Sequence, residues 1–174
     1  MGMYEKFRLD GKVAVVTGGG RGIGRGIALA FAECGADVVV VARRQADVDA
    51  VAAEIAERGQ RGLGISADVM DWTAIPKVLD RVVDEFGQLD IMVNNAGGNL
   101  DRQMHALPEI SLEKFDEQLS LNMKTKFWGS QQAAKRMTNG GRIINIISIA
   151  AHSPSPGFGV YSAANMGMIS MTRT

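Results

Sequence analysis

A glycine-rich segment, TGGGRGIG at residues 17–24, has the residue types and the spacing that phosphate binding needs. Glycines let the backbone come close to a pyrophosphate, and a helix that starts directly after them offers unpaired N–H groups and the positive end of its dipole. The glycine spacing does not match G-x-G-x-x-G, and a merely flexible turn is the alternative. The residues that we expect at a nucleotide are Gly18, Arg21, Gly22, Ile23 and Gly24.

Arginines near the second strand indicate which dinucleotide would fit. Sites for NAD usually carry an acidic residue at the end of that strand, which binds the ribose 2′-hydroxyl. This sequence has Ala42 there, followed by Arg43 and Arg44, and Asp37 lies at the opposite end of the strand. Guanidinium groups bind phosphate in a bidentate manner, so Arg43 and Arg21 suit the 2′-phosphate of NADP. We predict NADP, with NAD as the second choice, and Arg44 fits a surface charge.

Short apolar runs alternate with longer segments of helical period. The runs predict five buried strands, within residues 12–17, 37–42, 61–69, 89–97 and 141–148. The periodic segments predict helices at residues 22–36, 45–59, 72–87, 111–138 and from 162 onward, and the fourth is long enough for seven turns. Buried strands that alternate with helices form βαβ units with right-handed crossovers. The sequence therefore predicts one α/β domain over residues 1–174, a Rossmann-like, doubly wound parallel sheet with strand order 3-2-1-4-5.

The chemically notable residues fall at the carboxyl ends of these strands. Ligands of doubly wound sheets bind beyond those ends, near the switch point between strands 1 and 4. The residues at or just past a strand end are Thr17, Gly18, Ala42, Arg43, Asp68, Asn94–Gly97 and Ser148. We expect them to lie close together in the fold.

The composition argues against several classes of protein. Of 174 residues, 46% are apolar and 22% are charged, which is ordinary for a soluble globular protein. The 19 basic residues equal the 19 acidic ones, so no charge excess points to nucleic acid or to an anionic membrane surface. Without a membrane-spanning run or a secretory signal, a cytoplasmic protein is expected. The single cysteine, Cys34, makes no internal disulfide, and neither His105 nor His152 has a partner at metal-ligand spacing.

Taken together, the motifs resemble those of the short-chain dehydrogenase/reductase family over essentially the whole sequence. They are TGxxxGIG, Asp68 in ADV, NNAG at residues 94–97, Asn122, and Ser148 thirteen residues before Tyr161. The resemblance implies an oxidoreductase that interconverts a small alcohol and a ketone with a nicotinamide cofactor. It also implies contacts to the adenine and the adenosine ribose, made by Asp68, Val69, Asn95, Ala96 and Gly97.

Four positions form the active site that the resemblance implies. Tyr161 would pass a proton to the carbonyl oxygen as hydride leaves the nicotinamide, and it would also touch the cofactor. Ser148 would bond the same oxygen and stabilise its developing charge. Asn122 would hold a water in the proton path, with an ordinary surface asparagine as the alternative. Asn165 stands where the family has a lysine, four residues after the tyrosine on the same helix face.

The asparagine at position 165 removes a positive charge from that site. A lysine cation about 5 Å from a phenolate, at an effective dielectric of about 20, is worth about 3 kcal/mol, or roughly two pKa units. Lys124 and Lys126 flank Asn122, but nothing in the sequence shows that either reaches the site. Two hypotheses stay open: an NADP-dependent oxidoreductase, and a nucleotide-binding pseudoenzyme or fragment with little or no catalysis.

The last segment of the chain bears on assembly and on completeness. By resemblance, the chain lacks the C-terminal strands and the substrate loop of the family. The apolar stretch Met166–Met171 lies in a helix that the family pairs across a dimer interface. We therefore expect a homo-oligomer, either a dimer or a tetramer.

Overall fold

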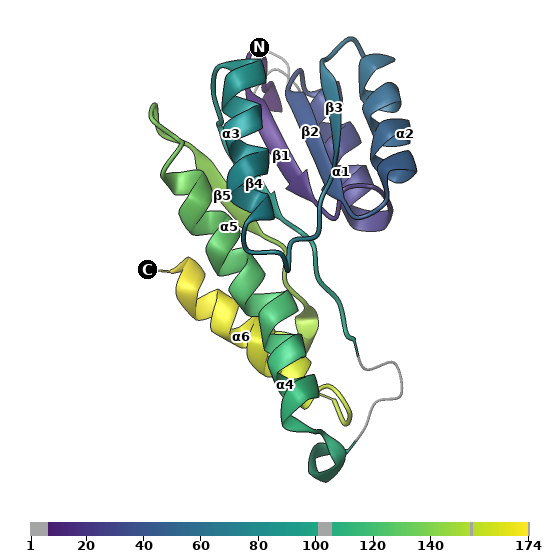
Figure 1. The fold of residues 1–174 in the computed structure, drawn as a ribbon, viewed down its shortest axis with the longest axis vertical. Coiled ribbons are helices and arrows are strands. Elements are labelled where there is room, and N and C mark those ends of the chain that lie inside the picture. The colour runs from purple at the N-terminus through teal and green to yellow at the C-terminus, as the bar shows by residue number, and fades with distance from the viewer. Residues whose placement is uncertain (1–6, 101–105, 154, 174) are drawn as a thin grey trace.

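The computed structural model describes residues 7–100, 106–153 and 155–173. Its centre is a parallel sheet in the order β3-β2-β1-β4-β5 (Figure 1). The strands are β1 (Val13–Thr17), β2 (Asp37–Ala42), β3 (Gly62–Ser66), β4 (Ile91–Asn94) and β5 (Arg142–Asn145). The predicted fold class and strand order are confirmed, and the switch point lies between β1 and β4.

Helices cover both faces of this sheet (Figure 1). On one face lie α1 (Gly22–Glu33) and α2 (Gln45–Ala56), and on the other lie α3 (Ala74–Phe86) and α5 (Thr125–Ala134). Pro76 occupies the first turn of α3, where its missing N–H group costs no helical hydrogen bond. Gly87 ends α3 in the left-handed conformation, with a φ of 81°.

Valines of the central strands build a core on each side of the sheet. Val15 pairs with Val39, and Val16 pairs with Val40. The first pair belongs to the core under α3 and α5, whereas the second belongs to the core under α1 and α2. Successive side chains of a strand point to opposite faces, so a run of valines fills both cores at once.

The prediction of one continuous α-helix over residues 111–138 is wrong. Helix α4 (Leu112–Leu119) passes into a π-helical turn, η3 (Ser120–Lys124), and α5 then ends at Ala134. Ser111 caps the start of α4, because its Oγ accepts a hydrogen bond from the Lys114 N–H group at 3.3 Å. A π turn adds one residue to the helical path and is often found at functional sites. Here it contains Asn122.

The chain returns to the carboxyl edge of the sheet after β5. A short 3₁₀ turn, η4 (Ile149–Ala151), follows β5 and precedes α6 (Gly159–Thr172), and another, η2 (Leu107–Glu109), precedes α4. Helix α6 starts before the predicted residue 162, so Tyr161 and Asn165 both lie inside it. It packs against α4 and η3.

No helix among the described residues is long and apolar enough to cross a membrane.

Candidate active site

The loop between β1 and α1 adopts backbone conformations that suit glycine. Gly18 has a φ of 65° and Gly22 a φ of 55°, a region that other residues rarely adopt. A Cβ atom on Gly18 would lie 2.9 Å from Asn95 Nδ2, and a Cβ atom on Gly24 would collide with the Gly18 carbonyl oxygen. At Gly22 an added Cβ would meet nothing within 4 Å. The inner side of the loop is therefore closely packed, and its outer side is open to a ligand.

The end of β4 holds this loop in place. Asn95 Nδ2 donates to the carbonyl oxygens of Thr17 and Gly18, at 3.0 and 3.2 Å. Thr17 Oγ1 accepts in return from the backbone N–H groups of Asn95 and Ala96, at 3.1 and 3.2 Å. The NNAG segment thus fixes the shape of the glycine loop, whatever else it contacts.

Positive charge borders the open side of the loop. Arg21 precedes α1 and makes no capping bond through its side chain, so the first N–H groups of α1 remain available to an anion. Arg44 forms an ion pair with Asp47, with Nη2 and Oδ2 2.6 Å apart. Among the ion pairs of the described residues, none involves Arg21 or Arg43. These two arginines are therefore better placed to meet a phosphate than Arg44.

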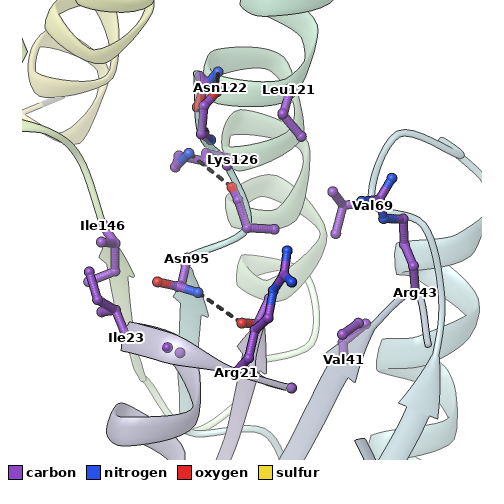
Figure 2. A pocket seen from close by; sticks show the side chains of 18 of the residues that line it. Arg21, Ile23, Val41, Arg43, Val69, Asn95, Leu121, Asn122, Lys126 and Ile146 are labelled. Carbon is purple, nitrogen blue, oxygen red and sulfur yellow. Dashed lines mark hydrogen bonds between the residues drawn. The ribbon is translucent and has the colours of Figure 1, made fainter. Parts of the chain in front are cut away.

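A cleft of about 1130 Å³ runs across the carboxyl edge of the sheet. Figure 2 shows Arg43 and Val69 on one side of it, and Ile146 on the other. All the residues that the sequence predicted for cofactor binding or chemistry border this cleft: Gly18, Arg21, Gly22, Ile23, Gly24, Arg43, Asp68, Val69, Asn95, Ala96, Gly97, Asn122, Ser148, Tyr161 and Asn165. The fold brings them together, and their individual roles remain predictions.

We divide the cleft into two ends. The loop end comprises the glycine loop with Arg21 and Arg43. The helix end comprises the polar lining residues of η3, α5 and α6 together with Ser148, which directly precedes η4: Asn122, Lys126, Ser148, Tyr161 and Asn165.

Asn122 is buried, with 1% of its surface exposed, so the alternative of a surface asparagine is wrong. Its Oδ1 accepts from the Gly98 N–H group at 2.8 Å, and its Nδ2 donates to the Gly98 carbonyl oxygen at 2.9 Å. The same Nδ2 also donates to the Gln118 carbonyl oxygen at 3.2 Å. Asn122 therefore fastens the segment after β4 to the π turn, at the wall of the cleft.

Asn165 links α6 to the start of η4. Its Oδ1 accepts from the Ser148 N–H group at 3.1 Å, and its Nδ2 donates to the Tyr161 carbonyl oxygen at 2.8 Å. Asn165 is 1% exposed, and both of its polar atoms already have protein partners. Ser148 Oγ accepts from the Ala150 N–H group at 3.1 Å. The asparagine thus positions Ser148, and this side-chain arrangement brings no charge to the site.

Tyr161 is half-buried at the cleft. The ring of Phe158 packs edge-on against the Tyr161 ring, with centroids 6.1 Å apart. This contact orients the phenol ring without using its hydroxyl group.

Lys126 does reach the cleft. It is 2% exposed, and its Nζ donates to the Ala96 carbonyl oxygen at 3.1 Å. Burial away from water lowers the pKa of Lys126 from 10.5 to about 8. Lys124 points elsewhere, since its Nζ lies over the Trp72 ring, 4.8 Å from the centroid. Its spacing of four residues from Asn122 was the sequence signal that could have identified Lys126.

Comparison with known proteins assigns the chain to a family. Residues 12–174 match the family model of the short chain dehydrogenases. The chain belongs to the short-chain dehydrogenase family.

Other members of this family are similar in sequence and in structure. The 2-dehydro-3-deoxy-D-gluconate 5-dehydrogenase of Escherichia coli is 41% identical, over 98% of this chain and 67% of its own length. A short-chain dehydrogenase from Burkholderia cenocepacia, solved in complex with NADP, is 39% identical with a TM-score of 0.88, over 95% of this chain and 67% of that one. An NAD⁺-bound xylitol dehydrogenase is 28% identical with a TM-score of 0.86, over 96% and 64%. The chain spans about two thirds of the length of these relatives.

The remaining predictions for this short-chain dehydrogenase concern less central residues. Asp68 accepts a hydrogen bond from the Met70 N–H group at 2.9 Å and so shapes the turn after β3. His105 lies outside the described residues, and His152 is exposed. Within the described ranges, no cluster of His, Cys, Asp or Glu could hold a metal ion.

Proposed function

We propose that this chain binds NADP(H) and interconverts an alcohol and a ketone by hydride transfer. The observation that carries the proposal is that a nucleotide-type glycine loop and a Ser–Tyr pair border one continuous cleft. A binding module for nucleotides alone would need the loop end, but it would have no use for a phenol and a hydroxyl at the other end.

The residues present fit a dinucleotide. The bare outer side of the loop at Gly22 gives a pyrophosphate close access to the first N–H groups of α1. Arg43 and Arg21 supply charge for a 2′-phosphate, and Asp68 and Val69 border the space for an adenine. One relative was solved with NADP and another with NAD⁺, so our choice of NADP depends on the arginines of this chain.

At the helix end, the chain's own groups would handle the proton. A bound nicotinamide cofactor supplies or accepts the hydride. Tyr161 would donate a proton to the carbonyl oxygen of a ketone, or accept one from an alcohol. Ser148 would bond the same oxygen and stabilise the charge that builds on it. Asn165 keeps the Ser148 backbone fixed relative to the helix that carries Tyr161.

Titration of NADPH and NADH, followed by cofactor fluorescence, tests the cofactor. We expect wild type to bind NADPH more tightly. Arg43→Ala should lose roughly 10- to 100-fold in NADPH affinity, as expected for one charged hydrogen-bond partner, and little in NADH affinity. Arg44→Ala is the matched control, because Arg44 is already paired with Asp47. Equal wild-type affinity for the two cofactors would contradict NADP preference.

Association with a second copy is the other part of the proposal. Exposed apolar side chains lie along α4, α5 and α6, namely Leu112, Phe115, Phe127, Met166 and Met171. Exposed apolar surface of this kind often marks an interface. Sedimentation at micromolar concentration should show a dimer or a tetramer, and a clean monomer would refute the expectation.

A further inference from the structure

Positive charge in the cleft is distributed unevenly between its two ends. The loop end and the adjoining end of β2 carry the arginines of the cleft, which are Arg21, Arg43 and Arg44. Across residues 7–100, 106–153 and 155–173, the one cationic side chain that borders the cleft from α5, α6 or β5 is Lys126. Among the described residues, Lys126 is therefore the cation that α5, α6 and β5 offer to the cleft that Tyr161 also borders.

The position of Lys126 is costly without a ligand. Its residue surface is 2% exposed, and it makes no ion pair within the described part of the chain. Lys126 has three N–H donors, and the described residues provide a single acceptor for them, the Ala96 carbonyl oxygen at 3.1 Å. Burial alone accounts for the lowered pKa of this lysine. A methionine or leucine would fill the same space without this penalty.

The ammonium group shares a small space with Asn122. A methyl group placed on Gly97 would lie 2.8 Å from Lys126 Nζ and 2.8 Å from Asn122 Oδ1. Figure 2 shows the Lys126 amine on the side of Asn122 and Ile146, and Arg43 on the opposite side. Asp68, Asp47 and Tyr161 are the other titratable side chains that border the cleft.

We propose that Lys126 is a cofactor-binding residue, which grips the nicotinamide-side ribose of the dinucleotide from α5 and supplies the positive charge that α6 lacks at Asn165. This inference rests on the proposed function, because it needs a dinucleotide in the cleft. The two N–H donors beyond the Ala96 bond would serve ribose hydroxyls. The charge of Lys126 would favour the ionised form of a phenol that came within a few ångströms of it.

Two nucleotide probes separate this role from a structural one. NADPH fills both ends of the cleft, whereas adenosine 2′,5′-bisphosphate carries the adenosine half and no nicotinamide ribose. Both are titrated against wild type, Lys126→Met and Lys124→Met by fluorescence or calorimetry. Lys124→Met is the matched control, since it makes the same substitution two residues earlier, at a side chain that lies over Trp72.

We expect Lys126→Met to weaken NADPH binding by roughly 10- to 100-fold, the range for a lost charged hydrogen bond, and to leave the bisphosphate affinity unchanged. Equal loss for both probes, or no loss for either, would overturn the inference. Lys126→Gln can keep the Ala96 bond without the charge, and it should show the same selective loss. If wild type itself binds neither probe, the proposed function fails instead.

A second-site change tests the charge. Asn165→Lys, added to Lys126→Met, places a cation one helical turn from Tyr161 and should restore most of the NADPH affinity. In a chain that turns over, it should also return the alkaline limb of the pH–rate profile toward that of wild type. A double variant no better than Lys126→Met would show that the loss came from packing around Ala96, and the assigned charge role would be wrong.

Discussion

The two ends of the cleft are built in opposite ways. At the loop end, the groups proposed to bind the cofactor are backbone N–H groups and exposed arginines, and packed glycines fix the shape. At the helix end, polar side chains are themselves buried: Asn122 and Asn165 are 1% exposed, and Lys126 is 2% exposed. Exposed groups cost little to maintain and adjust when a ligand arrives. Buried polar groups must be satisfied beforehand, and each is accordingly bonded to backbone.

This difference predicts how each end fails. Changes at the loop end should affect backbone shape or nucleotide affinity. Changes at the helix end should alter the rate of hydride transfer, or alter the free energy of unfolding through the cost of burying a polar group. The following changes are ordered from the largest expected effect to the smallest.

Tyr161→Phe should have the largest effect, and it should act on the reaction rate much more than on nucleotide affinity. Loss of the hydroxyl should slow hydride transfer by roughly 10²- to 10⁴-fold, the range for a general acid–base group. The ring contact with Phe158 is kept, so NADPH affinity should fall by no more than about tenfold, the cost of one neutral hydrogen bond to the cofactor. Single-turnover oxidation of NADPH with a panel of ketones measures the first effect, and fluorescence titration the second. A variant as fast as wild type would remove Tyr161 from the proposed chemistry.

Lys126→Met should stabilise the ligand-free protein at neutral pH, by up to about 3 kcal/mol. Burial lowers the folded-state pKa of Lys126 to about 8 from 10.5. Between these two pH values the unfolded chain binds more protons, so wild-type stability should rise with pH across that window.

Denaturant unfolding at several pH values measures this effect. The stability difference between Lys126→Met and wild type should shrink as the pH approaches 10.5. Lys124→Met is the exposed control and should show no such trend. A constant difference across the window would mean that Lys126 carries no burial penalty.

Gly24→Ala should destabilise the loop end by about 1–3 kcal/mol, as overpacking does, because its Cβ would collide with the Gly18 carbonyl oxygen. Nucleotide affinity should fall as well, since the loop backbone must move. Gly26→Ala is the matched control in the same helix, where an added Cβ meets nothing within 4 Å. It should stabilise the protein by roughly 0.5–1 kcal/mol. Equal effects of the two substitutions in denaturant melts would contradict the close packing of the loop.

Asn165→Ala should give the smallest change, a loss of about 1 kcal/mol in unfolding free energy for its hydrogen bond to the Ser148 N–H group. Asn165→Ala should lower the rate in the same way as Ser148→Ala but by less, because Ser148 loses the hydrogen bond that holds its backbone N–H group. Comparison of kcat and KM for the two variants checks this. A rate for Asn165→Ala equal to wild type would show that α6 and η4 hold Ser148 without the asparagine.

The sequence predicted the sheet well because strand signals are local. Apolar runs that end in Gly18, Arg43 or Asn95 identify both the strand and the edge at which ligands bind. The cluster of candidate residues in one cleft followed from that edge. The direction of Lys126 was not predictable in this way, because it depends on how α5 packs against the segment after β4.

The helix boundaries show the same limit. Residues 111–138 have good helical period throughout, and nothing local marks the π turn at residues 120–124 or the end of α5 at Ala134. The π turn is maintained by tertiary contacts, among them the bonds of Asn122 to Gly98. Likewise, the dual role of Asn95 as a clamp on the glycine loop appears only when β1 and β4 lie side by side.

The π turn also changes which face of the continuous helical segment α4–η3–α5 points toward the sheet. The two halves of this helical segment pack against different elements: α4 packs against α6, and α5 packs against α3 and β4. One extra residue rotates the side chains of α5 by about 100° around the helix axis relative to those of α4. This rotation lets α4 face α6 while α5 faces α3 and the sheet. Deleting one residue within 120–124 would leave a straighter, more regular helix. It would also rotate Lys126 out of the cleft and Ala133 out of the core, so this segment should tolerate substitutions far better than changes in length.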